Sequence, residues 1–464
     1  MPFNSFNFWL VFPFIFSIYW LIPSKYAAMK KWYLILVSYL LYMNWKPAFA
    51  IVLFYVTCIT FLGGWLFEQY NKRKLVVWAL GVLSLLPLLI FKYYNFINEN
   101  VIAGLERIGL HFAMPGLNWA IPVGISFFTF QAVGYFFDVY YKRISAEKSF
   151  TDYVLFVSFF PQVTSGPISK ASELLPQIKQ PHPFKYEQGV EGLKLLLWGM
   201  FIKLVVADRL GLYVDVVYTN YVHYSGYCCL LASVFYTFQI YGDFAGYSLM
   251  AMGIAKTLGY DIINNFRQPY LSVSVTDFWR RWHISLSRWL KDYAYIPLGG
   301  SRCSKLRNYW NIFVTFLVSG LWHGANWTFI VWGIMHGIAQ IIEKAVGCQK
   351  CDSQSFIVRA FRIFITFAIV NFAWIFFRMP SLNEAVSLIG KMFTSFNTGQ
   401  FLTHELTSIK IALPIMVIYD LMVEYDLFKR FHTPYIKWCT YVVLFIMILL
   451  IGVLDSGQFI YVSF

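Results

Sequence analysis

TFLVSGLWHGANW, residues 315–327, places an ionisable residue, His323, in one of the most apolar parts of the chain. Asn311, Thr315, Ser319 and His323 recur every four residues, and such steps keep polar groups on one slowly drifting face of a helix. We therefore expect His323 to face a packed, polar interior. Ionisable residues in apolar segments are expensive and mark functional sites by default, although a histidine that is only hydrogen-bonded to a neighbouring helix is the alternative.

Small residues accompany this polar face. Gly320 and Gly324 lie four residues apart, and Gly333 and Gly337 repeat the spacing in the apolar run that follows. Small residues at this spacing allow the backbones of two membrane helices to approach closely. The two runs are predicted to form a tightly packed helix pair.

The composition is that of a membrane protein. Hydrophobic residues make up 59% of the 464 residues and charged residues 13%, whereas a soluble domain has about half apolar and about a quarter charged residues. A helix needs about 20 apolar residues to cross a bilayer. Roughly a dozen runs approach that length, some of them too short to span alone, at residues 6–23, 32–45, 48–67, 75–91, 119–141, 150–163, 192–206, 228–241, 310–322, 327–342, 357–377, 409–422 and 438–454. We predict an all-α integral membrane protein with one domain, residues 1–464, made of a helical bundle (1–456) and a tail (457–464).

The basic residues indicate the topology. The net charge of +14 comes from lysines and arginines in short loops, so membrane orientation explains it better than nucleic-acid binding. Basic clusters at residues 25–31, 72–74 and 142–148 follow alternate apolar runs and are predicted to be cytoplasmic. Both termini are then outside the cytosol, and the uncharged start MPFNSFNF is predicted to be a retained anchor rather than a cleaved signal.

The cysteines indicate neither a disulfide framework nor a metal centre. All seven are scattered, mostly in apolar segments, and the CQKC of residues 348–351 lacks a second pair or nearby histidines that would complete a zinc site. We expect no metal site and no bound cofactor.

Two stretches depart from plain spanning helices. SFFPQVTSGPISK, residues 158–170, is either a re-entrant loop that lines a cavity or an ordinary surface loop. SVTDFWRRWHISLSRWLKDYAYIPLGG, residues 274–300, alternates aromatic and basic residues and is predicted to be an interfacial helix capped by Ser274 or Thr276. Its cationic face would meet lipid phosphates or the phosphates of a nucleotide-bearing donor, and its spacing makes His283 an interfacial structural residue.

A neutral histidine in a site with little water is suited to take the proton of a hydroxyl that attacks an acyl carbon. These residues do not separate an acyltransferase from a proton-coupled transporter. His336 follows His323 at a distance of about 20 Å along a continuous helix, so we expect it to be structural.

TDFWRRWHISLSRWLKDYAYIPLGGSR, residues 276–302, followed by VSGLWHGANWTFIVWGIMHG, residues 318–337, resembles the membrane-bound O-acyltransferase (MBOAT) superfamily. Within it, the alginate O-acetyltransferase branch also shows stretches similar to GISFFTFQAVGYFFDVY (124–140), FFPQVTSGPI (159–168) and YGDFAGYSLMAMGIAKTLGY (241–260). The resemblance implies a bundle around a transmembrane tunnel. His323 then matches the catalytic histidine of the WHG motif, and His283 matches the second family histidine.

The resemblance also implies substrates and partners. An acyl thioester such as acetyl-CoA would enter from the cytosol, and the acceptor would be an extracytoplasmic polysaccharide. A separate extracytoplasmic protein with an SGNH-hydrolase-like fold would complete the transfer at the bacterial inner membrane. The alternatives are a D-alanyl transferase supplied by a carrier protein and, from another class, a transporter or flippase. Residues near the two histidines are predicted to bind donor or substrate: Arg281, Arg288, Lys291, Ser319 and Asn326.

The tail GQFIYVSF, residues 457–464, is too aromatic for a free terminus. In one interpretation it docks against lipid or a neighbouring helix. In the other it enters the outer mouth of the tunnel, where His323 deprotonates Tyr461 and the tyrosine relays the acyl group to the partner. The pattern FIYxxF resembles a terminal motif of related acyl-transfer systems, and Ser463 offers a competing hydroxyl.

Overall fold

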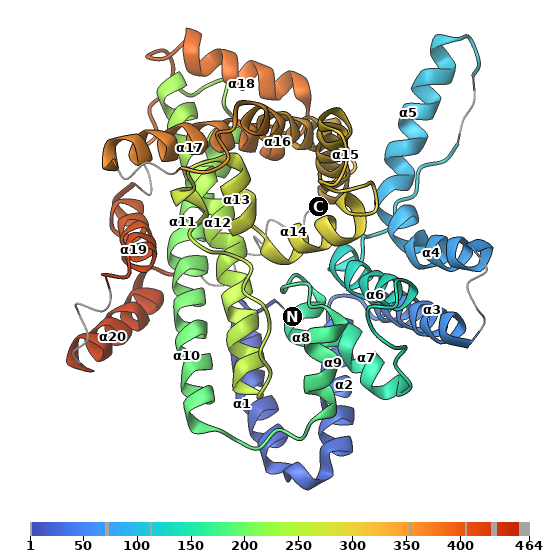
Figure 1. Ribbon diagram of the computed structural model, residues 1–464. Helices are drawn as coiled ribbons and strands as arrows, with labels where there is room; N and C mark the ends of the chain where they lie inside the picture. The colour runs from blue at the N-terminus through green and yellow to red at the C-terminus, as the bar shows by residue number, and fades with distance from the viewer. Residues whose placement is uncertain are drawn as a thin grey trace. The chain divides into compact units, whose positions relative to one another are not determined.

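The computed structural model describes residues 2–69, 74–111, 114–351, 355–403, 406–427 and 434–453. The regular structure in these ranges is helical (Figure 1), with one isolated bridge between Tyr224 and Gln400 and no strand. The all-α prediction is confirmed. The chain forms two compact units, one mainly of residues 7–192 and 251–263 and the other mainly of residues 193–250 and those from 264 onward. That all 464 residues make up one membrane domain stays a prediction.

The first unit contains α1 (Phe6–Leu21), α2 (Ala27–Met43), α3 (Phe49–Gln69), α4 (Lys74–Leu88), α5 (Tyr94–Arg107), α6 (Ile125–Tyr140), α7 (Phe150–Ser158), α8 (Phe160–Val163) and α9 (Ala171–Lys179). Apart from Phe6, the first residue of α1, which is grouped with the second unit, two helices contribute residues to both units, α10 (Tyr186–Met200) and α12 (Gly226–Thr257). The second unit contains α11 (Asp208–Thr219), α13 (Val275–Arg281), α14 (Ile284–Leu290), α15 (Lys305–His323), α16 (Trp327–Val346), α17 (Phe356–Arg378), α18 (Leu382–Thr394), α19 (Leu406–Glu424) and α20 (Pro434–Ile451). Short 3₁₀ turns, η1 (Ser24–Tyr26) and η4 (Pro269–Leu271), and π-helical turns, η2 (Leu89–Tyr93), η3 (Phe201–Ala207) and η5 (Lys291–Tyr295), join or extend these helices.

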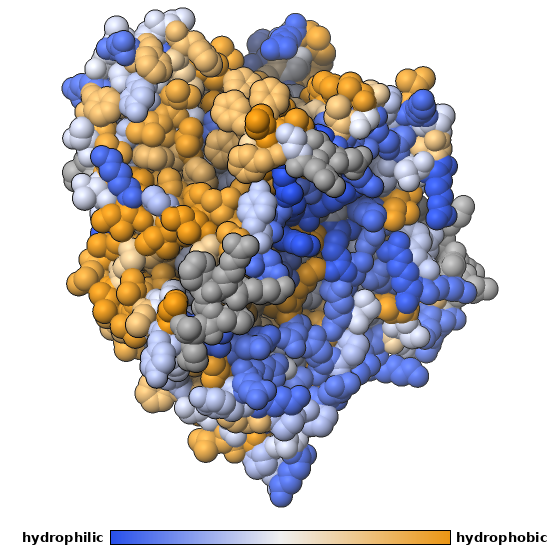
Figure 2. Space-filling view, turned by 60° about the vertical axis from the view of Figure 1, so that its left-hand side comes forward, coloured by the Kyte–Doolittle hydropathy of each residue, from blue (hydrophilic) through white to orange (hydrophobic). Residues whose placement is uncertain are grey.

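Among the described residues, fewer helices qualify as single membrane spans than the sequence has apolar runs. Six described segments are long and apolar enough to cross a bilayer, or seven if the bent pair α1 and α2 counts as one span. The expected number of roughly a dozen is not confirmed, because some apolar runs form shorter helices, such as α7 with 9 residues. Figure 2 shows many apolar side chains exposed on the visible surface, as expected of a protein in contact with lipid.

The predicted close pair of helices is α15 and α16. A Cβ atom on Gly320 would overlap the carbonyl oxygen of Phe329, and one on Gly333 would overlap that of Phe316. Only residues without a side chain allow the two backbones to approach this closely. The interpretation of the glycine spacing is confirmed, and the polar face beside it is buried, with Asn311 and Ser319 both 0% exposed.

Residues 274–300 form two short helices rather than one interfacial helix. Ser274 caps α13, since its hydroxyl accepts a hydrogen bond of 3.0 Å from the backbone of Asp277, as predicted. The helix ends at Arg281, and His283 then adopts a left-handed backbone (φ 43°) before α14 begins. Trp282 and His283 are fully buried. His283 therefore lies inside the second unit and not on its surface, and its level relative to the membrane interface stays a prediction.

Residues 158–170 are buried except for Lys170, which is half-buried. Gln162 donates a hydrogen bond of 2.8 Å to the Pro167 carbonyl, and the backbone of Phe160 donates one of 3.1 Å to the Ser38 hydroxyl. Irregular backbone is stable inside a membrane protein when its polar groups are paired in this way. The surface-loop alternative is wrong, while the lining of a cavity stays a prediction.

Candidate active site

His323 ends α15 inside a cluster of aromatic rings. Its side chain is almost fully buried. Its ring centre lies 4.7 Å from that of Trp322, 4.8 Å from Trp332 and 5.1 Å from Phe377. Bulk water has little access to this imidazole, which favours proton transfer between the histidine and a bound reactant.

His283 belongs to the same cluster. Its ring centre lies 5.7 Å from Trp322 and 4.6 Å from Phe244. Trp322 thus contacts both histidines. The distance between the two imidazole centres therefore cannot exceed the sum of their distances to the Trp322 ring. Burial lowers the pKa of His283 to about 3. This imidazole is therefore uncharged at neutral pH.

Asn265 holds the backbone on the C-terminal side of His283. The Asn265 carbonyl accepts a hydrogen bond of 2.9 Å from Ile284 N, and its side-chain oxygen accepts one of 3.1 Å from Ser285 N. The side-chain amide in turn donates to Ser248 of α12 at 3.3 Å. Asn265 is 0% exposed. It supplies acceptors for two amides at the start of α14 that have no partner within that helix.

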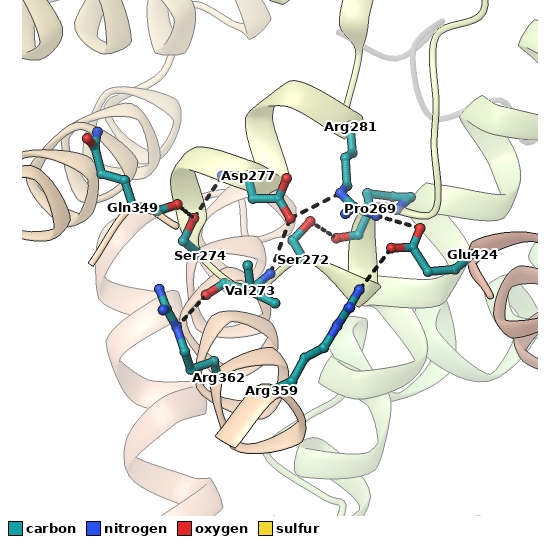
Figure 3. A network of polar contacts seen from close by, with 10 residues as sticks. All are labelled: Pro269, Ser272, Val273, Ser274, Asp277, Arg281, Gln349, Arg359, Arg362 and Glu424. Atoms are coloured by element: carbon teal, nitrogen blue, oxygen red, sulfur yellow. Dashed lines mark hydrogen bonds and ion pairs between the residues drawn. The ribbon is translucent and has the colours of Figure 1, made fainter. Parts of the chain in front are cut away.

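A network of ion pairs surrounds Arg281, two residues before His283 (Figure 3). Arg281 lies 3.1 Å from Asp277, four residues earlier on α13, and 2.8 Å from Glu424 of α19. Arg359 of α17 binds the other oxygen of Glu424 at 3.3 Å. The carboxylates of Asp277 and Glu424 thus compensate the positive charge of Arg281, which would otherwise attract the phosphates of a donor.

The remaining predicted binding residues have different surroundings. Lys291 is exposed and Arg288 half-buried. Ser319 is fully buried, one turn before His323 on α15. Asn326 accepts a hydrogen bond of 3.1 Å from Thr328 N and donates one of 2.8 Å to the Pro380 carbonyl, so it fixes the turn between α15 and α16.

Tyr461, with the rest of the tail, lies outside the described residues. The acyl-relay role of this tyrosine therefore stays a prediction.

The position of His336 differs from the expectation. The chain reverses between α15 and α16, so Trp332 contacts both His323 and His336, the latter at 5.0 Å. The estimate of about 20 Å assumed a single continuous helix and is wrong. The positions of Trp322 and Asn265 in the site were also not predicted from the sequence. Trp322 stands beside His323 in the sequence, but no local pattern marks Asn265.

A sequence model of the MBOAT, membrane-bound O-acyltransferase, family matches residues 8–383. The chain belongs to this family. It is 34% identical over 420 residues to the protein named "Probable alginate O-acetylase AlgI" of Pseudomonas syringae, covering 89% of this chain and 79% of that protein. It is also 34% identical over 404 residues to the peptidoglycan O-acetyltransferase of Helicobacter pylori, covering 80% and 75%.

A teichoic acid D-alanyltransferase of Streptococcus thermophilus is more distant from this MBOAT protein. The identity is 28% over 351 residues, covering 67% of this chain and 77% of the relative. This MBOAT chain is an O-acyltransferase of the membrane, and the O-acetyltransferases resemble it more closely than this D-alanyltransferase does. These findings favour acyl transfer over the transporter alternative.

Proposed function

We propose that this MBOAT enzyme transfers acetyl groups from a cytoplasmic acetyl thioester, acetyl-CoA, to an extracytoplasmic polysaccharide. The names of the relatives at 34% identity refer to O-acetylation of alginate and of peptidoglycan. The observation that carries the proposal is that His323 and His283 contact the same indole, Trp322, in a buried cluster. A base and a second polar group are thereby held close together where water is scarce.

In the proposed reaction His323 is the general base. It takes the proton of the attacking hydroxyl as the oxygen bonds to the acetyl carbon, and the same proton then passes to the departing thiolate. His283, which is uncharged, orients the hydroxyl or the thioester by hydrogen bonding. Lys291 is a better candidate than Arg281 for binding donor phosphates, because Lys291 is exposed whereas Arg281 is paired with two carboxylates. Arg288 stays a candidate for the same role.

The location follows from the same proposal. The enzyme resides in a bacterial inner membrane with both termini outside the cytosol, in accordance with the basic loops. A partner with an SGNH-hydrolase-like fold delivers the acetyl group to the polysaccharide, and Tyr461 is the candidate relay.

The test uses radiolabelled acetyl-CoA, polysaccharide from the producing cells, and the membrane and extracytoplasmic fractions of those cells, which together supply the full chain and the proposed partner. We expect release of CoA and label on the polysaccharide. His323→Ala should lower the rate by about 10²–10⁴-fold while the protein level is unchanged, since general base catalysis contributes that much. Wild-type membranes that accept D-alanyl carrier protein but not acetyl-CoA would contradict the proposal, and so would a fully active His323→Ala enzyme.

A further inference from the structure

His336 is a third histidine in this part of the second unit. It lies on α16 and is 1% exposed. Trp279 of α13 donates its indole N–H to His336 Nδ1 at 3.3 Å. An indole nitrogen can only donate, so Nδ1 must carry a lone pair. His336 is therefore a neutral imidazole with its proton on Nε2.

That proton has no acceptor among the described residues. His336 Nε2 is buried and unpaired, and the neighbouring rings include Phe278 at 6.1 Å and Trp374 at 6.3 Å. Aromatic rings accept hydrogen bonds only weakly. The indole nitrogens of Trp332 and Trp374 are likewise buried without a partner in the described parts of the chain.

His336, Trp332 and Trp374 thus bring together three buried N–H donors that have no acceptor among the described residues. The rings of Trp332 and Trp374 stack at 5.6 Å, and Trp332 also contacts His323 at 4.8 Å. A buried donor without a partner costs roughly 1–3 kcal/mol, a cost that a native fold retains for a reason. The ligand that suits such a site is an oxygen that accepts hydrogen bonds and gains negative charge.

We propose that His336 Nε2–H is a hydrogen-bond donor to the carbonyl oxygen of the acyl thioester during transfer. The inference rests on the proposed function and assigns a catalytic role to a residue that the sequence analysis considered structural. Trp279 acts as a positioning residue, because its hydrogen bond fixes the tautomer that places the proton on Nε2.

The proposed transfer has two stages, attack on the carbonyl carbon and release of the thiolate. The hydroxyl oxygen bonds to the carbonyl carbon, its proton moves to His323, and the π pair of the carbonyl moves onto the oxygen. The Nε2–H of His336 donates to this oxygen and keeps its proton. The carbonyl then re-forms, the carbon–sulfur bond breaks, and the thiolate takes the proton from His323. Donors aimed at such an oxygen stabilise the transition state more than the ground state.

Two amide variants separate this role from a structural one. The amide of His336→Gln reaches the position of Nε2 and can donate there, whereas that of His336→Asn reaches only Nδ1 and keeps the bond to Trp279. We expect the Asn variant to lose about 10²–10³-fold in kcat, the usual effect of removing one such donor. KM should change little, and the Gln variant should recover much of the loss. A structural role predicts the opposite order, because only Asn keeps the Trp279 bond.

Equal or higher kcat in folded His336→Asn than in folded His336→Gln would overturn the inference. If an amide variant does not fold, His336→Met provides the test, since methionine fills irregular core spaces but donates no hydrogen bond. A wild-type kcat in that variant would contradict the proposed donor role of His336. Wild-type and His323→Ala enzyme are assayed in parallel. An inactive wild type would count against the proposed function, whereas an active wild type with the wrong order of the amide variants rejects only the role of His336.

Discussion

His283 combines full burial with a backbone conformation that L-residues seldom adopt (φ 43°, ψ 55°). A left-handed conformation costs a non-glycine residue roughly 1–2 kcal/mol. Such strain persists where the surroundings over-determine it, often at functional sites. Here Asn265 supplies acceptors for the two backbone amides that follow the histidine. The histidine is thus oriented by a residue 18 positions earlier in the sequence.

We predict that Asn265→Ala lowers kcat for acetyl transfer by about tenfold or more. The variant leaves the buried amide of Ser285 unpaired, which costs roughly 1–3 kcal/mol, and the loop can relax to avoid that cost and so displace His283. Initial rates at saturating acetyl-CoA provide the measurement, with thermal stability in detergent recorded alongside. Asn265→Asp is the matched control, since it keeps the acceptor for Ser285 N and should retain more activity. An Ala variant with the wild-type rate would show that the loop holds its shape without this side chain.

Among the elements, α15 and α16 depend on glycine at their crossing. The overlap expected for a methyl group at Gly333 involves the backbone of Phe316, which cannot rotate away as a side chain can. His323 and Trp332 lie on these two helices, so their separation follows from the helix spacing.

Gly333→Ala is therefore expected to destabilise the protein by about 1–3 kcal/mol, as overpacking does. The measurement is the midpoint of thermal unfolding in detergent. The control is Gly390→Ala on α18, where nothing lies within 4 Å of the added methyl group, and where alanine should be neutral or slightly favourable. A Gly333→Ala protein as stable as the control would mean that the two helices can separate at little cost.

For the whole molecule, the sequence predicted the helical class, the membrane environment, the α15–α16 pair and the burial of His323, because these follow from composition and from spacing within one helix. It did not predict the break at His283, since the hydrogen bonds that stabilise the break come from Asn265, outside the segment. The proximity of His336 was missed because its distance from His323 was taken along a continuous helix, although the chain reverses between α15 and α16. Contacts of this kind depend on tertiary structure, which periodicity does not encode.

The orientation in the membrane gives a prediction for the second unit. Lys350 lies near the start of α17 and Asn397 follows α18, beyond the other end of α17, and both are exposed. By the positive-inside rule, we expect the end of α17 near Lys350 to lie in the cytosol. In a background without the seven native cysteines, Asn397→Cys should react with an impermeant maleimide added to intact cells. Lys350→Cys should react only after permeabilisation, and the reverse pattern would invert the topology.

The backbone at position 283 also restricts how the family can vary in evolution. Besides glycine, the residues that enter the left-handed region most readily are Asn, Asp and His. Glycine would keep the turn but remove the polar group beside Trp322. The residues that survive selection at this position should therefore be His, Asn or Asp, and a homologue that has exchanged the imidazole for an amide or a carboxylate would still fold the same turn.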